Sequence, residues 1–297
     1  MEQLIKLCEK FNCKYLQNEK MSLHTTFKIG GNARLVVYPQ NEEQISELVK
    51  CAKAENVRLI AVGNGSNLLV DDDGIDACVL ILGEPFSQIK LIDDETIYAK
   101  AGAKLIALCR FAYEHSLSGL EFAYGIPGSA GGAAFMNAGA YGGEMKDVLY
   151  KCEHIDKNGD RGFLENDDLK LSYRHSAYYD NGAVITGLYL KLKKGEKSEI
   201  KEKMDDLIGR AKQPLEYPSA GSTFKRPEGY FAGALIEQCN LKGKSVGGAQ
   251  VSEKHAGFVI NKGGATCKDV LDLCKYCSDK VMEETGVKLE MEIRVTK

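Results

Sequence analysis

Two glycine-rich segments have the composition that lets main-chain N–H groups surround an anion. The longer one covers residues 125–143 and reads GIPGSAGGAAFMNAGAYGG. Glycine admits positive φ and close approach of other atoms, so this density predicts backbone wrapped around a ligand. Pro127 has the φ of a first helical position, and a short helix over 129–135 would direct free N–H groups at a phosphate. The alternative is a tight crossing of elements that only requires small residues.

The shorter segment, GNGSN at 63–67, follows the apolar run 57–61 and reads as a loop after a strand. Neither segment fits the Walker pattern or a GxGxxG fingerprint after a first strand. Two loops rich in N–H donors, flanked by alternating strands and helices, predict one elongated ligand with two anionic groups. A dinucleotide has this form.

Ser222 has a hydroxyl that a ligand could reach, because it lies among small residues in PSAGSTFK at 218–225. Serines on exposed turns are common, and the residue types alone do not make this one catalytic. The chain has no GxSxG elbow and no recognisable histidine and aspartate partners for acyl transfer. These absences argue against a hydrolase.

A CxxC pair at Cys274 and Cys277 must be weighed as a metal or redox centre. Apolar residues repeat at helical spacing through 270–282, and both cysteines are part of that repeat. A zinc site would need a second pair at comparable spacing, which Cys239 and Cys267 do not supply. We therefore expect packed thiols on one helix face and no metal site.

Five motifs occur together and in order along the chain. They are GNGSNLLV at 63–70, GIPGSAGGAAFMNAGAYGGE at 125–144, YRHS at 173–176, PSAGSTFKRP at 218–227 and LEMEIRV at 289–295. Each motif is weak alone, but the ordered set is specific and extends over almost the whole chain. In these motifs the chain resembles the UDP-N-acetylenolpyruvoylglucosamine reductases, also called UDP-N-acetylmuramate dehydrogenases, which are FAD enzymes of peptidoglycan precursor synthesis.

The resemblance implies an α+β fold. An FAD-binding domain of two α/β subdomains, of the PCMH or vanillyl-alcohol-oxidase-like type, would precede a smaller C-terminal α+β substrate domain. FAD would be held without a covalent bond, and NADPH would reduce it before the substrate enters the same place, because no separate nicotinamide fingerprint is present. The expected FAD-binding residues are Gly63, Asn64, Gly65, Ser66, Asn67, Gly125, Pro127, Gly128, Ser129, Gly131, Gly132, Asn137, Ala138 and Gly139.

Three residues match the catalytic positions of the family, namely Ser222, Arg174 and Glu292. In the family, hydride adds to C3 of an enolpyruvyl ether and the serine protonates C2. Charge pushed onto C2 and the carboxylate must be held, and the planar guanidinium of Arg174 suits a carboxylate. Glu292, if protonated in the complex, would hydrogen-bond the same enol system. Without the resemblance, Arg174 would read as a surface ion pair and Glu292 as an exposed strand carboxylate.

Polar residues after the serine and before an apolar strand are candidates for binding the UDP part of the substrate. Lys225, beside Ser222, is the first candidate for the diphosphate. The others are Gln250, Ser252, Lys254, His255 and Asn261. A structural loop explains any one of these others almost as well.

Two other functions fit the glycine-rich loops. An oxidase of a small alcohol or hydroxy acid would share the fold but lack the set of Ser222, Arg174 and Glu292. A UDP-sugar-binding or flavin-storage module without catalysis would keep both loops and tolerate the loss of Ser222. Ser222 and its two partners therefore discriminate among the three functions.

The chain departs little from the family pattern. Arg226 and Met291 stand where Asn and Pro are frequent, and neither change removes a reacting group. The interval after Arg174 leaves no room for the tyrosine-bearing insertion of the longer branch. The sequence therefore resembles the shorter branch of the family.

Composition is that of an ordinary globular enzyme: 297 residues, 44% hydrophobic and 27% charged, with a net charge of −3. No basic tail or stripe predicts nucleic-acid binding. Charges throughout the first twenty residues argue against a signal peptide, and no apolar run approaches the length of a membrane span. Ten cysteines without a secretion signal indicate reduced thiols. We expect a cytoplasmic enzyme, a monomer, with small-molecule partners.

Alternating strands and helices must position these residues. We expect helices at 42–55, after the N-cap Asn41, and at 104–115, 231–239 and around the CxxC; strands are expected at 33–38, 57–62, 77–82, 95–101, 148–155, 161–164, 183–192, 258–260 and 287–295. Asn158-Gly159 predicts a hairpin turn. The predicted segments are an N-terminal helix (1–20), two FAD-binding subdomains (21–84 and 85–194), a charged linker (193–198) and a substrate domain (198–297).

Overall fold

The computed structural model describes residues 1–210 and 213–297, which divide into two compact units. Unit 1 comprises Met1–Gln17, Leu35–Asn64 and Ala77–Ala211, and unit 2 comprises Asn18–Arg34, Gly65–Asp76 and Lys212–Lys297. Each unit has its own buried apolar cluster. The units are interleaved along the chain, whereas the domains predicted from the sequence are consecutive.

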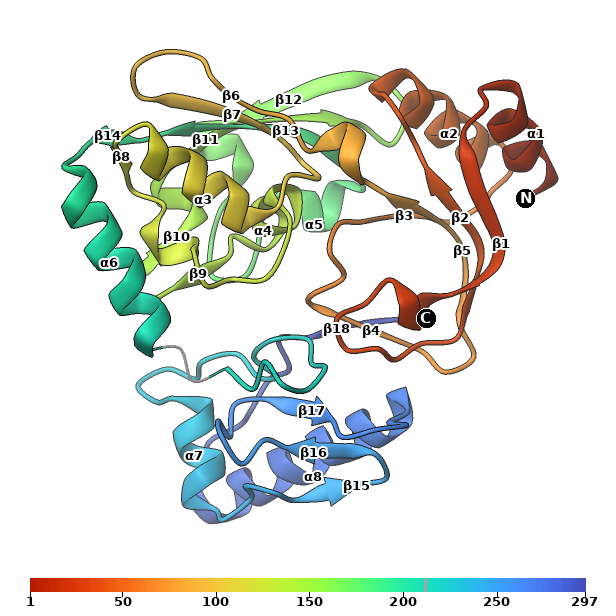
Figure 1. Ribbon diagram of the computed structural model, residues 1–297. Coiled ribbons are helices and arrows are strands. Elements are labelled where there is room, and N and C mark those ends of the chain that lie inside the picture. The colour runs from red at the N-terminus through yellow and green to blue at the C-terminus, as the bar shows by residue number, and fades with distance from the viewer. Residues whose placement is uncertain (211–212) are drawn as a thin grey trace. The chain divides into compact units, whose positions relative to one another are not determined.

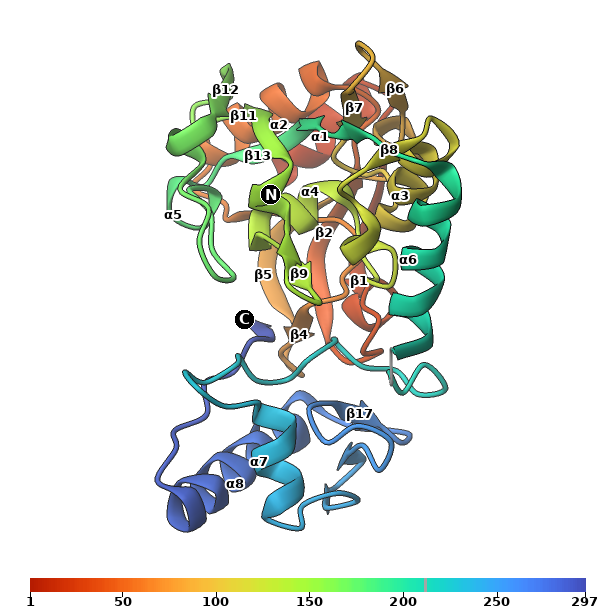
Figure 2. The ribbon, with the colours of Figure 1, turned by 90° about the vertical axis from the view of Figure 1, so that its left-hand side faces the viewer.

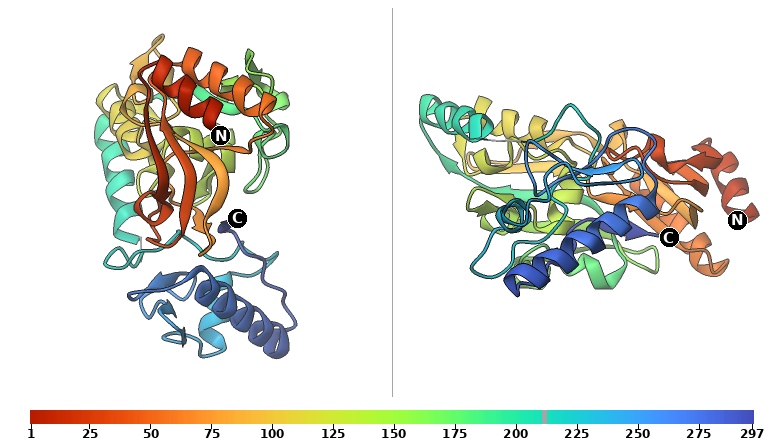
Figure 3. Two further views of the ribbon diagram at one scale, coloured as in Figure 1. Left: turned by 90° about the vertical axis from the view of Figure 1, so that its right-hand side faces the viewer. Right: turned by 90° about the horizontal axis from the view of Figure 1, so that it is seen from below.

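A four-stranded sheet and two helices open the chain. The strand order is β1-β2-β5-β3, and β3 pairs with β5 in parallel. The side-chain oxygen of Asn41 accepts a hydrogen bond from the Gln44 main chain, so the predicted N-cap is confirmed. Figure 3 shows the long strands together with the two helices. The bounds are α1 (Glu2–Lys10), β1 (Lys14–Lys20), β2 (Asn32–Tyr38), α2 (Glu42–Ala54), β3 (Leu59–Val62) and β5 (Ile75–Ile81).

The second sheet of unit 1 is antiparallel, with the order β12-β11-β13-β7-β6. Helices α3 and α4 lie along one face of it (Figures 1 and 2), where Ile97, Cys152 and Leu188 are fully buried. The predicted hairpin is confirmed, since Gly159 has φ of 84° between β11 and β12. The bounds are β6 (Ile89–Leu91), β7 (Thr96–Lys100), α3 (Leu105–Glu114), α4 (Ala130–Met136), β9 (Gly139–Ala140), β10 (Gly143–Glu144), β11 (Leu149–Ile155), β12 (Arg161–Glu165), α5 (Tyr178–Asn181) and β13 (Val184–Lys191).

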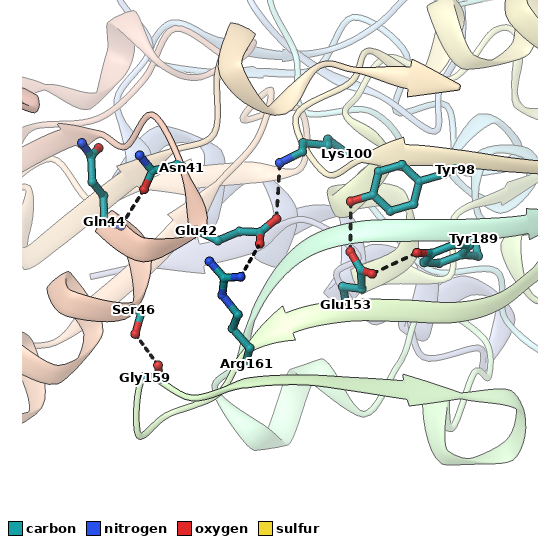
Figure 4. Close-up of polar contacts among 10 residues, drawn as sticks. All are labelled: Asn41, Glu42, Gln44, Ser46, Tyr98, Lys100, Glu153, Gly159, Arg161 and Tyr189. Carbon is teal, nitrogen blue, oxygen red and sulfur yellow. Dashed lines mark hydrogen bonds and ion pairs between the residues drawn. The ribbon is translucent and has the colours of Figure 1, made fainter. Parts of the chain in front are cut away.

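Polar contacts join α2 to the second sheet, as Figure 4 shows. Glu42 at the start of α2 lies 3.3 Å from Lys100 on β7 and 3.8 Å from Arg161 on β12. The hydroxyl of Ser46 donates to the carbonyl of Gly159 in the hairpin. These contacts fasten α2 to strands β7 and β12 and to the hairpin at Gly159.

Helix α6 (Lys197–Arg210) belongs to unit 1. Its residues Ile200 and Met204 are buried in the apolar cluster of that unit. The charged stretch predicted as a linker forms β14 (Lys193–Lys194), which pairs with β8 (Leu117–Ser118), and the start of α6. The charged side chains of this stretch are exposed on these elements. The sequence alone therefore predicted a linker here.

Unit 2 combines short strands with two helices. Strands β15, β16 and β17 form an antiparallel sheet, and α8 packs against β15 and β16. A capping box of Thr266 and Asp269 begins α8, and the Asp72 carboxylate accepts from the next two main-chain N–H groups. The bounds are β4 (Leu68–Val70), α7 (Ala232–Gln238), β15 (Ser245–Val246), β16 (Ala249–Val251), β17 (Val259–Asn261), α8 (Cys267–Thr285) and β18 (Arg294–Thr296).

The CxxC cysteines are packed thiols on α8, as predicted. Cys274 and Cys277 are almost completely buried in the apolar cluster of unit 2. Burial raises the pKa of Cys277 to about 12, which keeps it in the thiol form. Within 1–210 and 213–297, no three or more His, Cys, Asp or Glu side chains are grouped so that they could hold a metal ion. None of the described helices is both long and apolar enough to cross a membrane.

The closing strand is shorter than predicted. Only Arg294–Thr296 forms a strand, parallel to β4, while residues 287–293 make one isolated bridge, Phe224 to Met291. The alternating pattern of 287–295 predicted a longer strand. The predicted strand was too long, because the segment 223–225 pairs with 290–292 through only two main-chain hydrogen bonds and makes no full ladder.

Candidate active site

The end of β3 and the start of α4 meet inside unit 1. A Cβ atom added to Gly63 would lie 2.0 Å from the Ser129 hydroxyl oxygen, so only glycine fits there without movement. Ser129 caps α4 by accepting from the Gly132 main chain at 3.3 Å. The helix therefore begins at Ala130, so the predicted short helix over 129–135 is confirmed to within one residue, and Pro127 lies just before it.

Main-chain donors gather where these two loops meet. The N–H groups of Asn64, Gly128 and Ser129 donate to no atom of the described chain, and Ser129 is buried. Buried N–H groups in folded proteins are almost always paired, so such donors fit a ligand with anionic oxygens. The two loops that the sequence assigned to one ligand thus meet at Gly63 and Ser129.

Other glycines of the longer segment serve packing. A Cβ atom on Gly131 would lie 2.7 Å from the Ala101 Cβ, and one on Gly139 would lie 2.7 Å from the Glu144 Cβ. By contrast, a Cβ atom on Gly125 would have no heavy atom within 4 Å. The packing interpretation of the segment therefore applies to Gly131 and Gly139. Ala138, another predicted FAD-binding residue, holds the end of α4 by main-chain bonds to Ala133 and Met145.

Arg174 occupies the corner of a tight turn in unit 1. Ser172 and His175 exchange two main-chain hydrogen bonds of 3.1 Å, and Arg174 between them has φ of 55°. A non-glycine residue with positive φ is uncommon and costs conformational energy. The guanidinium Nη2 donates to the Gly139 carbonyl at 3.0 Å. The catalytic candidate is thus tied to the last residues of the glycine-rich segment.

In unit 2, the residues 65–67 lie beside the closing segment. Gly65 has φ of 61°, and a Cβ atom there would lie 2.1 Å from the His24 carbonyl oxygen. Asn67 Nδ2 donates to the Glu292 carbonyl at 3.3 Å, and the Arg294 main chain donates to the Asn67 carbonyl at 2.9 Å. Part of the first loop therefore fixes the backbone of Glu292. Ser66, another predicted FAD-binding residue, lies within this loop.

Ser222 and Glu292 come together in unit 2. The Glu292 main chain donates to the carbonyl of Thr223, the residue after Ser222, at 2.8 Å. Thr223 is buried, and its hydroxyl accepts from the Val259 main chain at 2.8 Å. Ser222 itself is exposed. Two of the three catalytic candidates are thus on paired segments, one with its hydroxyl accessible to a ligand.

The predicted substrate-binding residues differ in how many ion pairs and hydrogen bonds their side chains make within the protein. Lys225 pairs with Glu290, and Lys254 lies 3.6 Å from Glu216. Both lysines are only partly covered, so both are accessible to phosphate. His255 Nδ1 accepts from the Gly257 main chain at 3.0 Å.

Gln250 and Asn261 are engaged in holding the fold of unit 2. Gln250 donates to the Gly243 carbonyl and the Ser245 hydroxyl. Asn261 is buried; its Nδ2 donates to the Phe27 carbonyl, and its Oδ1 accepts from Gly263 and Ala265. Ser252 accepts from the main chains of Lys254 and His255. These side chains shape the loop around the candidate lysine and histidine.

Family comparisons cover most of the chain. Residues 33–161 match the FAD binding domain family. Residues 213–296 match the C-terminal domain of UDP-N-acetylenolpyruvoylglucosamine reductase. The first match holds both glycine-rich loops completely, and the second holds Ser222 and Glu292.

Relatives match along almost the whole length. A UDP-N-acetylenolpyruvoylglucosamine reductase of Clostridium perfringens is 50% identical over 279 residues, covering 93% of this chain and 90% of the relative. The enzyme of the same name from Streptococcus pneumoniae is 45% identical and covers 99% of this chain and 97% of its own. The crystal structure of UDP-N-acetylenolpyruvylglucosamine reductase from Thermus caldophilus superimposes with a TM-score of 0.82 at 35% identity, covering 96% of this chain and 99% of that one.

Proposed function

Because the chain belongs to the UDP-N-acetylenolpyruvoylglucosamine reductase family, we propose that it reduces UDP-N-acetylglucosamine enolpyruvate to UDP-N-acetylmuramate with electrons from NADPH. It is an FAD-dependent oxidoreductase of peptidoglycan precursor synthesis. The observation that carries the residue roles is the pairing of the Ser222 and Glu292 segments in unit 2. The family positions for proton donor and acid are neighbours there.

FAD binding is supported by the donors at Asn64, Gly128 and Ser129, which fit the phosphates of a dinucleotide. The contact between Gly63 and Ser129 keeps these donors on one surface. When bound, FAD supplies the hydride that adds to C3 of the enolpyruvyl group. The remaining chemistry belongs to side chains of the protein.

Arg174 would bind the carboxylate of the enolpyruvyl group. Hydride addition at C3 moves negative charge to C2 and that carboxylate, and a guanidinium stabilises the charge more as it develops. Its bond to Gly139 and its place at the corner of a turn orient the group before substrate arrives. Preorganised donors of this kind need no rearrangement during the reaction.

Ser222 would give its proton to C2, and Glu292 would hydrogen-bond the enol. A serine hydroxyl is a weak acid, so transfer requires a strongly basic carbon held against it. The main-chain bond between Thr223 and Glu292 keeps the acid and the proton donor on adjacent segments. We further propose that Lys225 and Lys254 bind the diphosphate. We also propose that the enzyme is a monomer and that it works in the cytoplasm, where its ten unpaired cysteines would stay reduced.

Glu292→Gln is expected to retain more activity than Glu292→Ala. A glutamine amide still donates a hydrogen bond to the enol, whereas alanine leaves none, and removing one such donor typically costs about 10²-fold or more in kcat. The kcat for the enolpyruvyl substrate should therefore fall in the order wild type, Gln, Ala. Glu283→Gln is the control, because Glu283 is an exposed carboxylate on α8 that pairs with Lys280. Equal activity of Glu292→Gln and Glu292→Ala would contradict a hydrogen-bonding role.

The decisive experiment for the function is NADPH oxidation that depends on UDP-N-acetylglucosamine enolpyruvate, measured without oxygen. The proposal predicts no turnover without the enolpyruvyl compound and UDP-N-acetylmuramate as the product. An oxidase would instead consume oxygen with an alcohol or hydroxy acid. A binding or storage module would show flavin without turnover. Either result would refute the proposed reaction.

A further inference from the structure

Asn137, at the end of α4, has every side-chain donor engaged within the protein. It is 0% exposed and has φ of 43°. Its Nδ2 donates to Glu144 Oε2 at 2.7 Å and to the Ser172 carbonyl at 2.9 Å, while its Oδ1 accepts from the Lys146 main chain at 2.8 Å. Only one orientation of the amide satisfies all three partners. Its side chain has no N–H group left to donate to a ligand.

The Ser172 carbonyl belongs to the turn that carries Arg174. That turn is bound to the end of α4 at three places, all in unit 1. Ser172 is held by Asn137, Arg174 donates to the Gly139 carbonyl at 3.0 Å, and the buried Ser176 hydroxyl donates to the Phe135 carbonyl at 2.7 Å. The segment 135–139 and the turn 172–176 therefore form one hydrogen-bonded piece.

A turn with Arg174 at φ of 55° needs such support. Strained backbone persists only where the surroundings over-determine it. The Asn137 amide holds the turn before its corner and Ser176 holds it after the corner. Without the Asn137 amide, the Ser172 carbonyl would be left without this donor, and the turn could relax toward ordinary φ.

We propose that Asn137 is a positioning residue for catalysis: its amide fixes the turn that aims the Arg174 guanidinium at the substrate. This inference rests on the proposed role of Arg174. Glu144 acts on the turn only through Asn137. Its carboxylate accepts a hydrogen bond from the Asn137 amide and so sets the orientation of that amide. Cofactor binding and substrate activation thus share a single segment, with the start of α4 facing the flavin phosphates and its end holding the arginine.

The test uses Asn137→Asp, which keeps the size and the acceptor for Lys146 but removes both donors and sets a carboxylate against Glu144. Transient kinetics without oxygen separate flavin reduction by NADPH from flavin reoxidation by the enolpyruvyl substrate. We expect FAD content and the NADPH step to stay near wild type and the substrate step to slow by about 10- to 100-fold. Asn56→Asp is the matched control, because Asn56 also follows a helix with positive φ (50°) and is exposed.

A double-mutant cycle with Arg174→Ala separates positioning from general damage. If Asn137 acts through Arg174, the double variant reacts with substrate no more slowly than Arg174→Ala alone. The inference would be overturned if the slowing factors of the two single variants multiplied in the double variant. It would also be overturned if the substrate step of Asn137→Asp were as fast as in wild type. A wild-type substrate step in Arg174→Ala would overturn the proposed role of Arg174 as well, and this arm does not involve Asn137.

Ser176→Ala provides an independent variant in case Asn137→Asp does not fold. It removes the hydrogen bond from the Ser176 hydroxyl to the Phe135 carbonyl and adds no charge. The same selective slowing of the substrate step and the same non-additivity with Arg174→Ala are expected. Equal slowing of both half-reactions in Ser176→Ala would overturn the assignment of this turn to substrate activation.

Discussion

Ser222→Ala is expected to slow reduction of the enolpyruvyl substrate by about 10²- to 10⁴-fold, the usual contribution of a general acid. Reduction of the flavin by NADPH should stay nearly unchanged, because no proton from Ser222 is needed in that step. The exposed position of Ser222, next to buried Thr223, also means that loss of its hydroxyl leaves the fold intact. Transient kinetics of the two half-reactions measure both effects.

Ser87→Ala is the control for Ser222→Ala. Ser87 is also exposed, and its hydroxyl bonds only to the nearby Glu84 carbonyl in unit 1. Both half-reactions of this variant should match wild type. Equal slowing of the two half-reactions in Ser222→Ala would reject a role as proton donor, since an acid used in one step cannot slow both.

Gly63→Val is expected to yield protein without bound FAD. The added Cβ would lie 2.0 Å from the Ser129 hydroxyl oxygen and 2.9 Å from its Cβ, so the start of α4 must move away from the end of β3. That movement separates the N–H donors of Asn64 from those of Gly128 and Ser129. The ratio of flavin to protein absorbance after purification measures the loss.

Gly83→Val is the matched control, because a Cβ on Gly83 meets no heavy atom within 4 Å. It should retain FAD at the wild-type ratio. If Gly63→Val does not fold, Gly63→Ala is the milder variant, with FAD affinity expected to fall by about tenfold, which is 1.4 kcal/mol. Wild-type FAD content in a folded Gly63→Val protein would contradict the assignment of this contact to the cofactor site.

Local chemistry made much of the fold predictable from the sequence. Asn41 was recognisable as an N-cap because the amide group that caps α2 lies within one turn of the helix. The hairpin at Gly159 and the packed cysteines of α8 were predictable for the same reason, since turn residues and helical periodicity act between near neighbours. The ordered motifs also identified the family, which the relatives confirm.

The predictions that failed depend on contacts distant in sequence. The closing segment alternates like a strand, yet only 294–296 finds a partner strand, β4, more than two hundred residues earlier. The charged residues 193–198 were predicted to be a linker, because the neighbouring sequence does not reveal that α6 packs within unit 1.

The sequence by itself determined the family, through five ordered motifs, and it offered N–H-rich loops suited to a dinucleotide. The roles proposed for Ser222, Arg174 and Glu292 came from the resemblance to that family and not from the residue types alone. Only the tertiary structure decided how each of these residues is used. Asn137 and Gly131 belong to the same glycine-rich segment as Gly125. Gly131 packs against Ala101, whereas Asn137 donates to the Ser172 carbonyl in the turn of Arg174. The physical reason is that the residue type fixes which hydrogen bonds a side chain is able to make. Its actual partner depends on which distant segment the fold brings within hydrogen-bond distance.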